Sequence, residues 1–166
     1  MPSCQNLLES HADLASRMQS HLEAVVMGDL SAARHTFLRF AALLIAHSGS
    51  EDEILIPVFE QNGLESNGCS VAILQKEHAK LRRLLAAEQT RVFADDVALD
   101  APTRIVWVES LHMLKEVLEH HDMRERAAFN PVLDQALGAE KAAALAQKAS
   151  EREAEIEAAW LAENSV

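Results

Sequence analysis

Two segments of the sequence repeat the same order of residue types that can bind metal ions. One reads HSGSEDEILIPVFEQ from His47, and the other reads HDMRERAAFNPVLDQ from His121. Each has a Glu four residues after its His and a Pro six residues after that Glu. Residues four apart lie on one face of a helix, so both side chains can reach one point. A single such pair is usually an ordinary surface ion pair, but two copies with matching prolines predict a site of imidazole and carboxylate ligands.

Two further histidines lie in segments that also resemble one another, ESHADL around His11 and KEHAKL around His78. The chain is therefore interpreted as two copies of a helical hairpin. In an antiparallel hairpin, residues equidistant from the turn lie at the same height. His11 and His47 are centred on residue 29, and His78 and His121 between residues 99 and 100. Both centres fall in turn-forming segments, so we expect the four histidines at one level.

The remaining pattern is helical throughout, because apolar residues recur at steps of three and four without sustained alternation. Turn-forming residues interrupt it at 28–29, 62–70, 95–102 and 138. Ser70 and Asp100 are predicted N-caps, since short side-chain acceptors there satisfy free backbone amides. Five helices are expected, near 4–27, 31–61, 71–94, 101–137 and 139–162.

The predicted fold class is all-α. The first four helices, in a domain over residues 1–137, should form an antiparallel up-down-up-down four-helix bundle, because short connections favour antiparallel neighbours. An additional C-terminal helix occupies residues 138–166, with a thin apolar stripe of Leu145, Ala149, Ile156 and Trp160. This stripe is expected to dock on the bundle or, as the alternative, on a second subunit in a homodimer.

A buried set of four histidines and two glutamates would be costly as plain packing, at ~1–3 kcal/mol for each unpaired polar group. Bound cations remove that cost. Mixed imidazole and carboxylate ligands suit first-row metals such as iron, manganese or zinc, rather than Ca²⁺ or Mg²⁺. Six protein groups exceed the needs of one tetrahedral zinc, so two ions are predicted.

These motifs resemble the hemerythrin-like domain, the hemerythrin HHE cation-binding family, over about residues 5–137. The resemblance implies two iron ions, with a bridging oxo or hydroxo group. It implies that His11 and His47 bind one iron, that His78 and His121 bind the other, and that two glutamates bridge them. The implied metal ligands are His11, His47, Glu51, His78, His121 and Glu125.

The resemblance further implies a protein that binds or senses O₂ or NO. Oxygen-carrying members have a second histidine four residues after the one on the third helix, where this chain has Arg82. That departure keeps open an oxidoreductase acting on peroxide or NO, or a protein for iron handling or iron-centre repair in nitrosative or oxidative stress. A metal-free helical interaction protein is the third hypothesis. No catalytic residue is assigned, and an enzymatic role is not the favoured one.

The composition of the chain limits which binding partners and which location are expected for the protein. A formal charge of -11 without a cluster of Lys and Arg disfavours nucleic acid and anionic membranes. No apolar run long enough for a membrane span and no secretory signal are recognised, so the expected location is the cytoplasm. Cys4 and Cys69 are expected to be ordinary thiols there. The other histidines, His21, His35, His112 and His120, are interpreted as surface or satisfied core residues, with His120 at most supporting a ligand.

Overall fold

The computed structural model describes residues 5–66 and 68–164, and in this part of the chain the regular structure is entirely helical. The all-α prediction is confirmed. Cys4, the first residue of the expected 4–27 helix, and the last two residues of the 138–166 segment lie outside the described residues. None of the described helices is long and apolar enough to cross a membrane.

The helices begin and end close to the predicted positions. The first is α1, Gln5–Met27, and the next predicted helix comprises α2, Leu30–Ser50, the π-helical turn η1, Glu51–Leu55, and α3, Ile56–Gln61. After α4, Val71–Val92, the fourth comprises α5, Ala101–Arg124, the π-helical turn η2, Glu125–Phe129, and α6, Asn130–Leu137. The chain ends with α7, Ala139–Asn164.

Local chemistry explains these ends. Asp29, Ser70 and Asp100 each accept a hydrogen bond from the backbone N–H three residues further on, which confirms the two predicted N-caps and adds one. Gly28 and Gly138 have φ angles of 72° and 76°, in the left-handed region that glycine adopts at little cost. Each therefore lets the chain leave one helix and enter the next within a residue or two.

The two π-helical turns occupy equivalent positions in the two repeats. Each begins at the Glu of the repeated phrase and ends two residues before its Pro, at Pro57 or Pro131. The N–H groups of Ile56 and Asn130 bond to the carbonyls of Glu51 and Glu125, five residues earlier. Proline lacks an N–H and crowds the carbonyl four residues before it, so a wider turn accommodates it. The repeat is thus structural as well as sequential.

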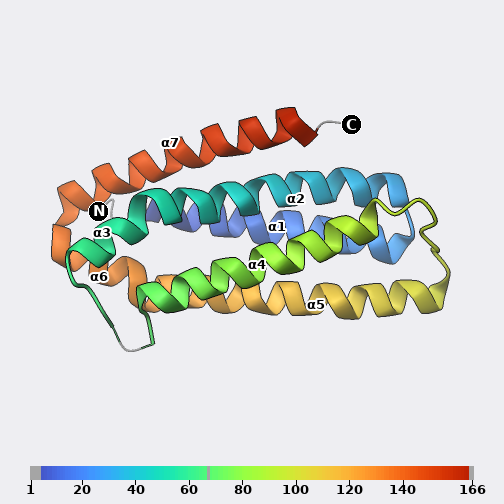
Figure 1. Cartoon of the computed structure of the whole chain (residues 1–166), viewed down its shortest axis with the longest axis horizontal. Coiled ribbons are helices and arrows are strands. Elements are labelled where there is room, and N and C mark those ends of the chain that lie inside the picture. The colour runs from blue at the N-terminus through green and yellow to red at the C-terminus, as the bar shows by residue number, and fades with distance from the viewer. Residues whose placement is uncertain (1–4, 67, 165–166) are drawn as a thin grey trace.

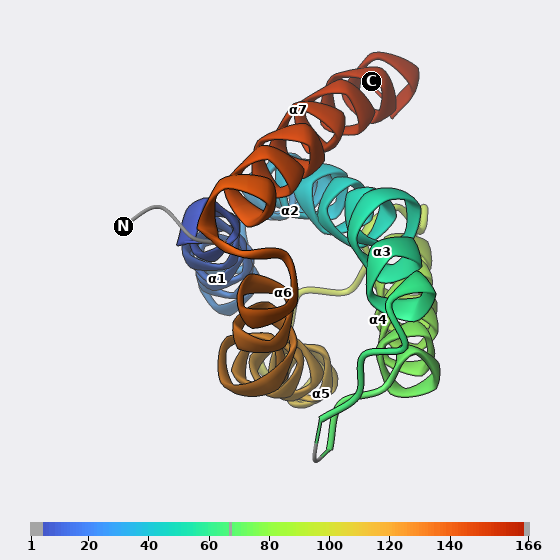
Figure 2. The ribbon, with the colours of Figure 1, turned by 90° about the vertical axis from the view of Figure 1, so that its left-hand side faces the viewer.

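Four helices pack around a common interior, with contacts of α1 on α2, α2 on α4, α4 on α5, and α5 on α1. Figure 2 shows this ring end on, and Figure 1 shows α7 running along the outside of α2. Two apolar clusters fill the interior. One contains Phe40, Leu44, Trp107 and Leu114, as expected for core, with Val117 packed against it. The other surrounds Phe59 and Phe129 near α3 and α6.

Helix α7 packs chiefly on α2, and also contacts α1, α6 and η1 of its own chain. Its fully buried face consists of Ala142, Ala146, Ala149 and Glu153. Of the predicted stripe, Ala149 lies on this face, whereas Leu145, Ile156 and Trp160 are only partly buried. Small side chains allow α7 to approach closely, and Glu153 is the one charged member of its buried face.

Candidate metal centre

The structure brings all six predicted site residues together in the interior. Along α2 and α3, α4, and α5 and α6 they lie between residues of the two apolar clusters, and on α1 His11 precedes residues of the first cluster, so they form a polar layer with apolar residues on both sides. His11 is 4% exposed and the other five residues are 1% exposed or less. This places the six side chains at one level, as the spacing from the turns predicts: His11, His47, Glu51, His78, His121 and Glu125.

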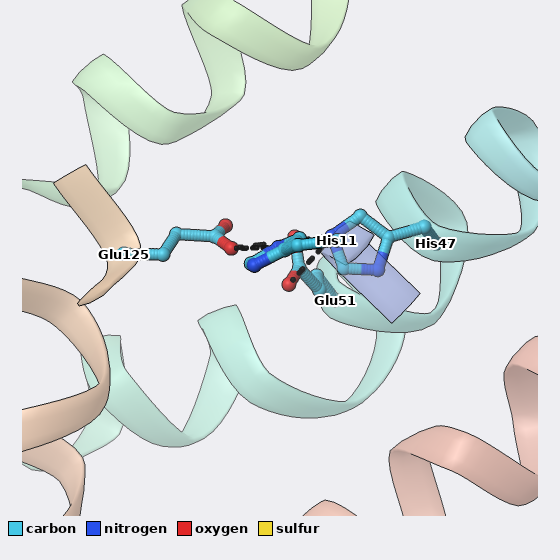
Figure 3. A group of neighbouring side chains, drawn as sticks. All are labelled: His11, His47, Glu51 and Glu125. Carbon is cyan, nitrogen blue, oxygen red and sulfur yellow. Dashed lines mark hydrogen bonds and ion pairs between the residues drawn. The ribbon is translucent and has the colours of Figure 1, made fainter. Parts of the chain in front are cut away.

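The six residues form two overlapping groups of four. In each group, one ligand-type atom from every residue lies within 4.8 Å of the others. The first group has His11 and His47 with both glutamates, and the second has His78 and His121 with both glutamates. Figure 3 shows the first group, with the carboxyl groups of Glu51 and Glu125 directed toward the two imidazole rings. Both carboxylates therefore belong to both groups.

The atoms that meet are the Nε2 atoms of the histidines and the carboxylate oxygens. In the first group, His11 Nε2 lies 2.7 Å from Glu125 Oε2, and His47 Nε2 lies 3.3 Å from Glu51 Oε1. In the second, His78 Nε2 lies 3.2 Å from Glu51 Oε2, and His121 Nε2 lies 3.0 Å from Glu125 Oε1. Each glutamate thus directs one oxygen to each group.

The geometry fits cations better than a closed hydrogen-bond network. Two Nε2 atoms face each other across 2.9 Å in the first group, His11 with His47, and across 3.3 Å in the second, His78 with His121. Glu51 Oε2 and both oxygens of Glu125 lie close to Nε2 atoms, yet these buried contacts lack the geometry of hydrogen bonds. The nitrogen and oxygen lone pairs therefore converge without enough hydrogen-bond donors between them. A bound cation can satisfy such lone pairs.

The outward nitrogen of every histidine also faces a carboxylate, which the sequence analysis missed. These contacts fix each ring with Nδ1 outward and Nε2 toward the centre, an arrangement found around metal-bound histidines. Asp52, Glu77 and Asp122 are each next to a site residue in the sequence, so these three contacts could have been suspected from the sequence. The pairs are His11 with Asp122 at 2.6 Å, His47 with Glu153 at 2.9 Å, His78 with Asp52 at 2.7 Å, and His121 with Glu77 at 3.3 Å.

Three of these four outer carboxylates are held by arginines. Asp52 pairs with Arg82, Glu77 with Arg124, and Asp122 with Arg126. Arg82, at the position where oxygen-carrying relatives are expected to have a histidine, also donates to Ser48 Oγ at 3.0 Å. Its guanidinium therefore supports the outer carboxylate of Asp52 and does not enter the centre.

The electrostatics of the centre favour positive charge. Burial by itself lowers the pKa of His11, but its contacts with Asp122 and Glu125 outweigh burial and raise this pKa to about 9. Burial also lowers the pKa of His78, but its contacts with Asp52 and Glu51 outweigh burial and raise this pKa to about 9. For Glu51, burial raises the pKa, yet the charge of His47 and the other imidazoles hold it well below its usual value. Cations that bind here must displace these imidazole protons.

The other histidines take the roles expected of surface and core. His21 is fully buried, and its Nε2 lies 2.9 Å from Glu88 Oε1. His35 and His112 are exposed. His120 is also exposed and bonds to a backbone carbonyl on its own helix, so it does not support a ligand.

The fold and the buried cluster define a helical domain whose donor set is compatible with metal binding. A family model described as the hemerythrin HHE cation-binding domain matches residues 4–133. The chain belongs to this family, as the paired motifs predicted. No curated protein and no solved structure matches the chain.

Proposed function

We propose that the protein holds two iron ions, one with His11 and His47 and the other with His78 and His121. In this proposal Glu51 and Glu125 bridge the ions. The observation that carries it is that both carboxylates belong to both four-residue groups. The proposal takes the helices of residues 1–137 as an antiparallel up-down-up-down bundle with the 138–166 helix added, and an oxo or hydroxo bridge would complete the centre.

The choice of iron rests on the donors and on the family. Imidazole and carboxylate donors suit first-row metals, and a carboxylate-bridged pair inside a helical bundle suits iron. Bound ferrous iron would supply one-electron redox chemistry and an open coordination position for a diatomic molecule. We propose that the protein works in a reducing location such as the cytoplasm. The buried free thiol of Cys69 is compatible with that location.

We infer that the ligand of this centre is O₂ or NO, which the protein binds or senses. Its six residues are at most 4% exposed, and apolar clusters close both ends of the polar layer. Such a site admits small molecules, and its apolar walls exclude bulk water from a bound ligand. Outer carboxylates accept hydrogen bonds from Nδ1 of His47, His78 and His121, and Asp122 lies beside Nδ1 of His11, so the Nε2 atoms stay directed inward.

The gas-binding function is tested by loading the protein with Fe²⁺ without air and then admitting O₂ or NO. We expect a visible charge-transfer band to appear on admission of the gas. The variant with both His47→Ala and His121→Ala should bind less iron and give no such band. An iron-loaded protein whose spectrum stays unchanged with either gas would contradict this function.

One observation favours an oxidoreductase as the second candidate. The guanidinium of Arg82 turns to Asp52 and Ser48, so the His78 and His121 group gains no third imidazole from α4. A coordination position left to a solvent molecule there would suit turnover of peroxide or NO. Repeated consumption of the oxidant in the presence of a reductant would support this candidate, and a single stoichiometric event would count against it.

The remaining alternatives fit the geometry less well. Repair of another protein's iron centre would require contact with a large partner, whereas these six residues are almost fully enclosed. A metal-free interaction protein would leave buried carboxylate oxygens without hydrogen-bond donors, which is costly. Protein purified without any transition metal, and unaltered by the His47→Ala and His121→Ala changes, would favour that last alternative.

A further inference from the structure

Glu153 connects α7 directly to the candidate metal centre. Its Oε2 accepts a hydrogen bond from His47 Nδ1 at 2.9 Å, and its Oε1 accepts one from Ser10 Oγ at 2.7 Å. Glu153 is 9% exposed and extends the alanine face with which α7 packs on the bundle. A carboxylate on a face otherwise made of alanine is costly to bury unless it has partners, and these two contacts provide them.

Two features distinguish Glu153 from the other outer carboxylates. Asp52, Glu77 and Asp122 lie within residues 4–133, which the family model covers, but Glu153 lies beyond them. The other three also pair with arginines, whereas the second partner of Glu153 in the described residues is the hydroxyl of Ser10. A hydroxyl carries no positive charge, so no arginine of the described residues competes with the His47 ring for this carboxylate.

We propose that Glu153 is a positioning residue for His47, and that α7 thereby completes the part of the centre formed by His11 and His47. This inference rests on the proposed metal-binding function. A carboxylate on Nδ1 fixes the tautomer, holds the plane of the ring and makes Nε2 a stronger donor. Because Glu153 contacts only one of the four imidazoles, its effect should fall on one of the two ions.

The same geometry couples the docking of α7 to cation binding. α7 is also held by ion pairs of Glu157 with Arg17 on α1, and of Arg152 with Glu53 on η1. The packed alanine face keeps Glu153 in reach of His47 even when one of these ion pairs is removed, and a cation on Nε2 strengthens the Nδ1–H contact in return. Such coupling is reciprocal, so cation binding should tighten the docking of α7.

The test titrates the full-length, metal-free protein with Co²⁺, whose visible spectrum reports its ligands, in the wild type and three variants. Glu153→Ala removes the acceptor, and Glu153→Gln keeps an acceptor oxygen without the charge. Glu157→Ala is the matched control, because it removes an α7 contact one turn away that does not touch the centre. Circular dichroism of the metal-free variants establishes that each is folded.

We expect Glu153→Ala to weaken the binding of one Co²⁺ by about 10–100-fold and to shift its spectrum, leaving the other ion unaffected. Glu153→Gln should show a smaller loss, and Glu157→Ala should bind both ions as the wild type does. If Glu153→Ala does not fold, Glu153→Gln carries the comparison. Glu77→Ala, which removes the acceptor for His121, should weaken the other ion, and the double variant should weaken both.

The outcomes separate this inference from the function on which it rests. Wild-type protein that binds no Co²⁺ would overturn the metal-binding proposal itself. Wild-type protein that binds two ions, with wild-type affinity and spectrum in both Glu153 variants, would overturn only the role of Glu153. Equal losses in Glu157→Ala and Glu153→Ala would also overturn it, because they would show a general effect of α7 docking.

Discussion

Replacing Glu88 tests how far buried polar contacts stabilise this bundle away from the metal centre. Glu88 on α4 is 4% exposed, and its Oε1 lies 2.9 Å from His21 Nε2 on α1 and 2.6 Å from Trp107 Nε1 on α5. One carboxylate oxygen thus joins three helices. The second oxygen lies 3.8 Å from the guanidinium of Arg91.

Glu88→Ala would leave the Trp107 N–H and a ring nitrogen of His21 buried without their partner. Each orphaned group costs ~1–3 kcal/mol, so the two together cost about 2–6 kcal/mol. We therefore expect the free energy of unfolding to fall by about 2–6 kcal/mol, a large part of the ~5–15 kcal/mol typical of a domain.

The assay is urea unfolding followed by circular dichroism, with a chelator present so that metal binding does not contribute. The matched control is Glu116→Ala, which breaks an exposed His–Glu pair, with 3.2 Å between His112 and Glu116, on the surface of α5. Surface changes of that kind usually alter stability by less than ~0.5 kcal/mol. A loss below about 1 kcal/mol for Glu88→Ala, or a loss equal to the control's, would show that these buried contacts do not stabilise the bundle.

Two further predictions concern the centre and the thiols. Replacing Glu51 or Glu125 by Ala should leave fewer than two irons per chain and lower the melting temperature of the iron-loaded protein, because each carboxylate is proposed to bridge both ions; two irons retained in both variants would rule out bridging. Burial raises the pKa of the Cys69 thiol to about 11, so in a Cys4→Ser background Cys69 should resist iodoacetamide at pH 8 until urea unfolds the protein, and rapid labelling of the folded protein would contradict its burial.

Much of the fold could be predicted from local chemistry. The helix ends follow from Gly28 and Gly138, which adopt left-handed angles, and from the capping side chains of Ser70 and Asp100. The meeting of the site residues could be predicted because distances from the turns fix the register of helical hairpins. Neither inference required knowledge of how side chains pack.

Two features of the structure could not be predicted from the sequence: the two π-helical turns and the contact of Glu153 with His47. Pro57 and Pro131 lie just after the π-helical turns at Glu51 and Glu125, but a proline can be accommodated by a kink as well as by a wider turn, so the sequence does not distinguish the two. The pairing of Glu153 with His47 spans 106 positions. The larger apolar residues of α7 were used to predict its buried face, and that prediction left out Glu153. The buried face consists instead mainly of alanines, because only small side chains allow close packing on α2.

In the proposed centre, the carboxylates of Glu51 and Glu125 hold two cations between two pairs of imidazoles. Native mass spectrometry of the full-length protein, loaded with Fe²⁺ without air and freed of excess metal, tests it most directly. We expect a dominant species with two irons per chain in the wild type, and a loss of iron in the His47→Ala and His121→Ala variants. A wild-type protein that retains no iron, or at most one ion at saturating Fe²⁺, would contradict it.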